Sequence, residues 1–222
     1  MRRVGLVTIG QSPRDDVVPE IRRYLPPGVE ILEAGVLDGL SPEEIAAHAP
    51  ASPERTLVTR LRDGREVVVD AEFVHRRLQG AIEELAKEAE IIGLLCSGKF
   101  PKLASPVPLL VPHELLRGFF SALVLPGPLG VLVPSPQQVT PTERESRDWG
   151  VGAVVRALSP YREDAQTALE ETAYILRQRG VAAVLLNCFG YGEELKQSLS
   201  RSLERPAIAI RSLFARALAE LL

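Results

Sequence analysis

The sequence predicts an α/β fold in which mainly parallel strands are covered by helices on both faces. Short runs of Val, Ile and Leu alternate with amphipathic segments along the whole chain of 222 residues. Because these runs are apolar throughout, they are typical of strands buried on both sides. The Asp63-Gly64 turn between two strand-like segments predicts one antiparallel hairpin inserted in the first half.

In the first half, the predicted elements have recognisable boundary signals. Ser12-Pro13 indicates an N-cap and a first helical position, and Pro26-Pro27-Gly28 indicates the end of that helix. The segment from Ser41 to Glu44 has the pattern of a capping box. The predicted strands are 4–9, 29–35, 56–62, 65–70 and 91–95, and the predicted helices are 13–24, a short one from Ser41, and 71–89.

The second half repeats this order of elements. Residues 130–145 resemble 5–17 as a strand followed by Ser-Pro and a helix, and 172–191 resemble 81–100 as a helix, a strand, a Cys and a Gly. The repeat predicts two similar lobes that face each other across a cleft, over 1–110 and 111–222, with the chain crossing between them near its termini. The predicted strands are 107–111, 129–133, 151–157, 182–186 and 206–210, and the predicted helices are 113–123, 136–149, 163–179, 192–203 and 211–222.

Charge and composition exclude several classes of partner. The chain has 26 Lys and Arg against 29 Asp and Glu, a formal net charge of −3, so no basic face for nucleic acid or an anionic membrane is expected. No segment approaches the roughly 18 apolar residues of a membrane helix. The opening apolar run stops at Gln11 without a small-residue cleavage site, so we interpret it as a strand and expect a cytoplasmic protein.

Motifs for cofactors and metals are also missing from the sequence. The glycine-rich nucleotide-binding patterns and the GxSxG pattern of α/β-hydrolases are absent, so no cofactor is expected. The two cysteines lack CxxC spacing and have no His close in sequence, so no metal site is expected. In a reducing compartment we expect them to be free thiols. We interpret His48, His75 and His113 as surface or core residues.

Cys96 and Cys188 are the candidate catalytic residues. Both stand where a predicted strand ends, which is the edge where ligands bind in open α/β sheets. A helix starting after each cysteine would favour its thiolate. Two such thiols on opposite sides of a ligand could racemise a carbon acid without a cofactor, one removing a proton and the other delivering one. The alternative is that each is a buried strand-end cysteine acting as a small apolar residue.

Residues next to the two thiols are candidates for binding an anionic substrate. Backbone N–H groups after each cysteine could form an anion-binding nest, or could belong to simple turns. Asn187 could donate to a carboxylate or an enediolate, or only close its strand. Lys99 could hold an anion or lower the thiol pKa, or be a solvated loop residue. The candidates are Ser97, Gly98, Lys99, Asn187, Phe189 and Gly190.

The loops after two other strands supply further candidates. Gln11 and Ser12 follow the first strand, and Ser135 follows the strand at 129–133, so we expect all three at the cleft. Ser12 could cap its helix, donate to a carboxylate, or do both. Arg14 could bind a substrate carboxylate or pair with Asp15 or Glu20.

The segments GLVTIGQSPRDDVVPEI, LLCSGKF, LLNCFGY and SLFARALAELL together resemble the AroM family. The resemblance covers essentially the whole chain and implies membership of the aspartate/glutamate/hydantoin racemase superfamily, with its pseudo-symmetric two-lobed fold. It implies that Cys96 and Cys188 are the first-lobe and second-lobe thiols, and that Gln11 and Ser12 lie in the carboxylate-binding loop. It also raises a homodimer as an expectation.

The chain departs from the amino-acid racemases at two places. Gln11 replaces the acidic residue of their Asp-Ser pair, and Phe189-Gly190 replaces the Thr-His after their second thiol. Both departures favour a hydantoin-like or dicarboxylate substrate, or lost catalysis. The first hypothesis is therefore a cofactor-independent racemase or isomerase acting on a small anionic metabolite. The alternatives are a maleate-isomerase-like or decarboxylase-like enzyme that uses one thiol, and a non-catalytic binding or accessory protein linked to aromatic amino-acid metabolism.

Overall fold

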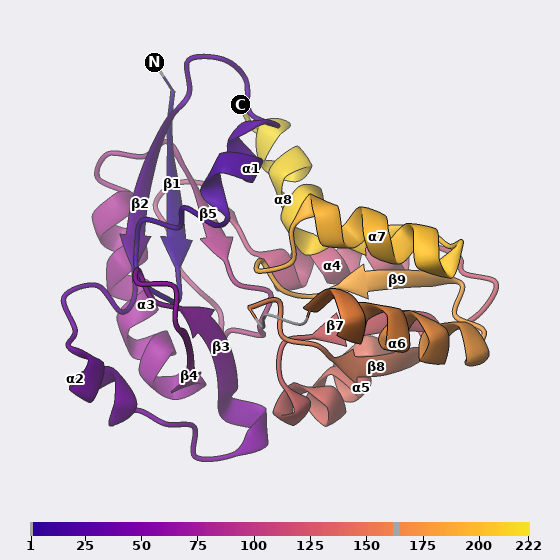
Figure 1. Ribbon diagram of the computed structural model, residues 1–222. Helices are drawn as coiled ribbons and strands as arrows, with labels where there is room; N and C mark the ends of the chain where they lie inside the picture. The colour runs from indigo at the N-terminus through magenta and orange to yellow at the C-terminus, as the bar shows by residue number, and fades with distance from the viewer. Residues whose placement is uncertain (1, 162–164) are drawn as a thin grey trace. The chain divides into compact units, whose positions relative to one another are not determined.

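The computed structural model describes residues 2–161 and 165–222. The chain divides into two compact units, one made of Met1–His113 with Ala215–Leu222 and the other of Glu114–Phe214. Each unit is built on a four-stranded sheet whose neighbouring strands are all parallel, with helices packed against it (Figure 1). The predicted α/β class is therefore confirmed.

The first unit has the strand order β2-β1-β5-β6 and carries the hairpin insert. Its core includes the buried side chains of Val7, Leu78, Ile82 and Leu94, so α3 packs on the apolar face that β1 and β5 supply. The elements are β1 (Arg3–Thr8), α1 (Val18–Arg22), β2 (Glu30–Gly35), α2 (Pro42–Ala46), η1 (Pro53–Arg55), β3 (Thr56–Arg60), β4 (Glu66–Asp70), α3 (Ala71–Leu85), β5 (Ile91–Leu95) and β6 (Leu109–Leu110).

The hairpin and its neighbours follow the boundary signals of the sequence. β3 and β4 pair antiparallel around Gly64, whose φ of +91° is the left-handed conformation that glycine adopts without strain. Asp70 caps α3 by accepting hydrogen bonds from the N–H groups of Glu72 and Phe73, and it also pairs with Arg55. The Arg55 hydrogen bond outweighs burial and holds the pKa of Asp70 well below its ordinary range.

The second unit has the strand order β10-β9-β7-β8. Read from the opposite edge, this order matches the first unit: β7 and β1 are the inner strands that come first in the chain, and β9 and β5 lie beside them. The elements are α4 (Pro112–Ser121), β7 (Leu129–Val133), η2 (Pro136–Gln138), α5 (Val139–Asp148), β8 (Ala153–Ala157), α6 (Ala165–Gln178), β9 (Ala183–Leu186), α7 (Glu193–Leu203), β10 (Ala207–Ala209) and α8 (Ile210–Ala219).

Equivalent glycines show that the repeat extends to packing. A Cβ atom on Gly5 would lie 3.2 Å from Leu85 of α3, and one on Gly130 would lie 3.3 Å from Leu176 of α6. In both units the inner strand therefore approaches its covering helix at a residue with no side chain. The chain passes between the units within α4 and again within α8.

Several element boundaries differ from the sequence predictions. The first helix begins at Val18 and not at Pro13, because the N–H and hydroxyl of Ser12 both donate to Asp38 and no cap forms there. β6 is confined to two residues between Pro108 and Pro112, which lack the N–H that a longer ladder needs. Residues 163 and 164 of the predicted helix 163–179 lie outside the described residues. In the described parts of the chain, no helix combines the length and the apolar character needed to span a bilayer.

Candidate functional site

Each sheet has a topological switch point, where later strands are added on the opposite side of the first strand. Each cysteine lies at one of these two points. In the first unit β2 and β5 lie on opposite sides of β1, so the carboxyl ends of β1 and β5 form the switch point. Cys96 directly follows β5. In the second unit the corresponding strands are β7 and β9, and Cys188 follows β9 after Asn187. Ligands of open α/β sheets bind at such points.

The two thiols have the same local geometry. Neither cysteine forms a disulfide, and both are partly exposed. The Sγ atom of Cys96 accepts a hydrogen bond from the N–H of Gly98 at 3.4 Å, and that of Cys188 accepts one from Gly190 at 3.4 Å. A hydrogen bond to sulfur stabilises the thiolate more than the thiol. Each cysteine packs against the apolar core of its own unit and keeps part of its surface exposed.

The surroundings of the two cysteines differ beyond this contact. No helix or strand occurs over residues 97–108, so the predicted helix after Cys96 is wrong, and α7 begins only at Glu193. A Cβ atom on Gly190 would lie 2.5 Å from Pro160 and 2.7 Å from the Tyr161 hydroxyl. The Cys188 loop therefore needs glycine to pass beneath the 160–161 segment.

The loop after β1 is held by a carboxylate that the sequence analysis missed. Asp38 accepts hydrogen bonds from the N–H of Ser12 at 2.8 Å and from its hydroxyl at 2.6 Å. It also accepts one from the N–H of Gly35 at 2.7 Å. A Cβ atom on Gly35 would lie 2.6 Å from both the carbonyl oxygen of Gly10 and the nitrogen of Ser12, so the loop packs directly on this glycine. An acidic side chain from the segment after β2 therefore lies at this loop, although position 11 itself is Gln.

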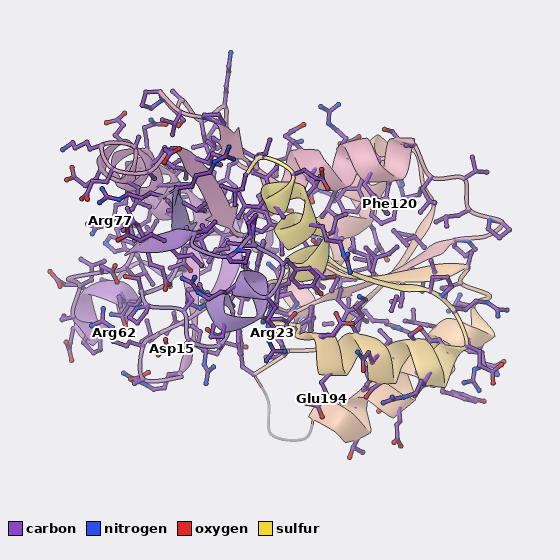
Figure 2. All side chains as sticks on the ribbon, turned by 90° about the horizontal axis from the view of Figure 1, so that it is seen from above. Asp15, Arg23, Arg62, Arg77, Phe120 and Glu194 are labelled. Atoms are coloured by element: carbon purple, nitrogen blue, oxygen red, sulfur yellow. The ribbon has the colours of Figure 1, made fainter. Side chains whose placement is uncertain are left out.

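The hairpin insert also reaches the loop after β1. Gln11 accepts a hydrogen bond from the backbone N–H of Arg62 at 3.0 Å, and the Arg62 guanidinium donates to the carbonyl of Ser12. The same guanidinium lies 3.6 Å from the Asp38 carboxylate. Figure 2 labels Arg62, which comes from the hairpin turn, and Arg77, whose guanidinium donates to the carbonyl of Val36 at 2.7 Å. A pocket of about 310 Å³ opens beside Gln11 and Arg62.

Replacing Asp38 by Ala is expected to lower the free energy of unfolding by about 1–3 kcal/mol, because three donors lose their acceptor. The Asp38 side chain is 33% exposed, so water takes over part of these contacts and the lower half of that range is expected. Urea unfolding followed by circular dichroism measures the change. Glu84→Ala removes only an exposed pair with Lys87 and is the control. A loss no larger than that of the control would contradict this role of Asp38.

Arg14 is a buried cation beneath the same strand end. Its guanidinium donates to the hydroxyl of Thr8 at 3.0 Å and to both carboxylate oxygens of Asp16 at 2.8 Å. The ion pair that the structure shows is with Asp16, a partner that the sequence prediction of Asp15 or Glu20 did not include. Burial alone would raise the pKa of Asp16, but the hydrogen bonds and charges of Arg14 and Arg60 outweigh it and lower that pKa. Burial raises the pKa of the nearby Glu33, which accepts the N–H of Arg14.

The two candidate side chains that follow Cys96 differ in exposure, since Ser97 is buried and Lys99 is exposed. His75 of α3, interpreted from sequence as a surface or core residue, lies against this loop, with its ring 5.0 Å from that of Phe100. Burial lowers the pKa of His75 despite a hydrogen bond with the backbone of Lys99.

In the second unit, the candidates around Cys188 are largely buried. Ser135 is buried and its hydroxyl donates to the side chain of Gln137. Asn187 is buried, and its N–H donates to the carbonyl of Leu132 at 2.9 Å, which extends the β7–β9 ladder. Phe189 packs edge-on against Phe214 at 5.2 Å between ring centroids. Within the described residues, no group of three or more His, Cys, Asp or Glu side chains is arranged to hold a metal ion.

Solved structures with the same fold include racemases and a decarboxylase. Allantoin racemase from Klebsiella pneumoniae matches 100% of this chain and 87% of its own, with 16% identity and a TM-score of 0.63. Aspartate racemase from Picrophilus torridus matches 100% and 94%, with 15% identity and a TM-score of 0.64. A liganded variant of arylmalonate decarboxylase matches 100% and 92%, with 14% identity and a TM-score of 0.65. At these identities the likeness shows the fold alone.

Sequence comparisons give one family and no curated relative. No curated protein matches the chain significantly. The family model described as "AroM protein" matches residues 4–222.

Proposed function

Since the chain belongs to the AroM protein family and has a racemase-type fold, we propose that it is a cofactor-independent racemase or isomerase. Its substrate is a small carboxylate or hydantoin-like anion with an acidic C–H bond. Cys96 and Cys188 act as the acid and the base. The proposal requires the two sulfur atoms to reach opposite faces of one bound substrate.

The observation that carries the proposal is the equivalence of the two thiols. Each lies at the switch point of its own sheet, is partly exposed, and accepts an N–H from the glycine two residues later. A cysteine kept only for packing would be a small apolar side chain in the core. Here both cysteines are partly exposed, and both sulfurs accept a hydrogen bond that favours the anionic form.

The chemistry balances without another reactant. One thiolate takes the proton from the carbon, and the electron pair that is released is delocalised onto the adjacent carbonyl as an enolate. The opposite thiol then gives its proton to the other face of that carbon, so a thiol and a thiolate have exchanged places. Proton exchange with water restores the starting state. N–H and hydroxyl donors around Ser97 and Asn187 would stabilise the negative charge of the enolate.

The proposal is tested by solvent deuterium incorporation. The protein is incubated in D₂O with a panel of enantiopure carboxylates and hydantoins and a metal chelator, and deuterium at the α-carbon is followed by NMR. The wild-type protein is expected to exchange at least one of these substrates, and a Cys96→Ala/Cys188→Ala double variant is expected to exchange none faster than buffer. Equal exchange by the two proteins would overturn the proposal.

The same panel separates the alternatives. Release of CO₂ that depends on one cysteine only would indicate a decarboxylase-like enzyme. A ligand that raises the melting temperature of both proteins equally, without exchange, would indicate a binding protein.

A further inference from the structure

A buried arginine of α8 lies level with Cys188 in the second unit. Leu186 of β9 is paired with Ala209 of β10, and Cys188 and Arg211 stand the same number of residues past that pair. Arg211 is 3% exposed. It lies in the first turn of α8, directly after the edge strand β10.

The guanidinium of Arg211 binds the backbone of this loop. Its Nε atom donates to the carbonyl oxygen of Phe189 at 2.7 Å, and its Nη2 atom donates to the same oxygen. That carbonyl belongs to the peptide group whose N–H, on Gly190, donates to the Sγ atom of Cys188 at 3.4 Å. One planar peptide group therefore joins a buried cation on its oxygen side to the cysteine sulfur on its nitrogen side.

We propose that Arg211 is the positioning residue for Cys188: it fixes and polarises the Phe189–Gly190 peptide group so that the N–H holds the sulfur as a thiolate. Two donors on one carbonyl set the orientation of the peptide plane. A positive charge at the carbonyl oxygen also strengthens the hydrogen bond made by the N–H of the same group. The catalytic consequence rests on the proposed function, whereas the effect on the thiol does not.

Other ionisable side chains also lie against this loop. The Tyr161 hydroxyl lies over Gly190, and the Tyr191 hydroxyl donates to the carbonyl of Leu158 at 2.6 Å. Both are phenols and carry no positive charge, so neither replaces the guanidinium of Arg211. In the first unit, Gly93 of β5 is paired with Leu110 of β6. His113 follows Leu110 by the same number of residues as Cys96 follows Gly93, so His113 occupies the position that Arg211 occupies in the second unit. Arginine keeps its charge at every accessible pH, whereas histidine does not.

The experiment measures the alkylation rate of each cysteine against pH. Iodoacetamide is added to the native protein between about pH 5 and pH 10, and the Cys96 and Cys188 peptides are quantified by mass spectrometry. In the wild-type protein the midpoint for Cys188 is expected below the ordinary thiol value of about 8.5. Arg211→Met is expected to raise that midpoint by about one unit and to slow alkylation of Cys188 at neutral pH about 3- to 10-fold, with Arg211→Lys between the two.

Internal and external controls accompany the measurement. The rate at Cys96 is expected to stay unchanged in every variant, and Arg201→Met, which removes an exposed arginine of α7, is expected to leave both cysteines unchanged. If Arg211→Met fails to fold, the wild-type midpoint and Arg211→Lys still decide the question.

Two results would overturn the proposal. One is a wild-type Cys188 midpoint at or above about 8.5, and the other is a folded Arg211→Met with the wild-type profile. Because no substrate is used, these results are independent of whether the protein proves to be a racemase.

Discussion

Cys96→Ser and Cys188→Ser are each expected to abolish racemisation while leaving proton exchange for one enantiomer only. A serine hydroxyl is too weakly acidic to replace a thiol as a proton donor or acceptor near neutral pH. Loss of one such group costs about 10²–10⁴-fold in rate. The remaining thiolate can still remove the proton that faces it and return a deuteron to the same face. Chiral chromatography measures the racemisation, and NMR of each pure enantiomer in D₂O measures the exchange.

The two single variants serve as controls for each other. Because the thiols face opposite sides of the carbon in the proposed mechanism, the variants are expected to retain exchange of opposite enantiomers. Racemisation by either variant at the wild-type rate would contradict the mechanism. If both variants lost exchange of the same enantiomer, or only one substitution had an effect, a single-thiol reaction would explain the data better.

The sequence predicts most of the fold because the signals that define it are local. The buried runs at β5 and β7, the Asp63-Gly64 turn and the capping box at Ser41 each depend on neighbouring residues. The repeat of strand, cysteine and glycine predicts the equivalence of the two sheets, since the same local pattern folds in the same way. The start of α1 is wrong because Ser12 is bound by Asp38, a residue distant in sequence.

The candidate site is less accessible to sequence reasoning for the same physical reason. The positions of Cys96 and Cys188 at strand ends follow from hydrophobic pattern alone. The contacts that hold their surroundings are non-local: Asp38 with Ser12, Arg62 with Gln11, and Arg211 with the Phe189 carbonyl. A polar residue soon after a predicted strand, such as Asp38 after β2, is the signal that could have identified the first of these.

Replacing Arg14 by Leu is expected to lower the free energy of unfolding at neutral pH by about 3–5 kcal/mol, because it leaves a largely buried carboxylate without its main cation. The Asp16 side chain is 17% exposed, and among the described residues Arg60, at 3.8 Å, is the cation that remains beside it. Since folding lowers the pKa of Asp16 below its ordinary value of 3.8, its ionised form stabilises the fold above that pH. This contribution disappears as the pH falls through the lowered pKa.

The cost of Arg14→Leu is therefore expected to shrink at acid pH, because the buried Asp16 carboxylate of the variant, without its main cation, is relieved there by taking up a proton. Glu33 acts in the same direction, because the charge of Arg14 lowers its pKa and the variant loses that stabilisation only where Glu33 is ionised. Urea unfolding at neutral pH and at about pH 3 measures the effect. Arg76→Leu removes only an exposed pair with Glu72 and is expected to cost under about 0.5 kcal/mol. Adding Asp16→Asn to Arg14→Leu should recover part of the loss, because the uncompensated charge is then gone. A loss that is equal at both pH values would mean that Arg14 stabilises the strand end by packing and by its bond to Thr8, and not by neutralising Asp16.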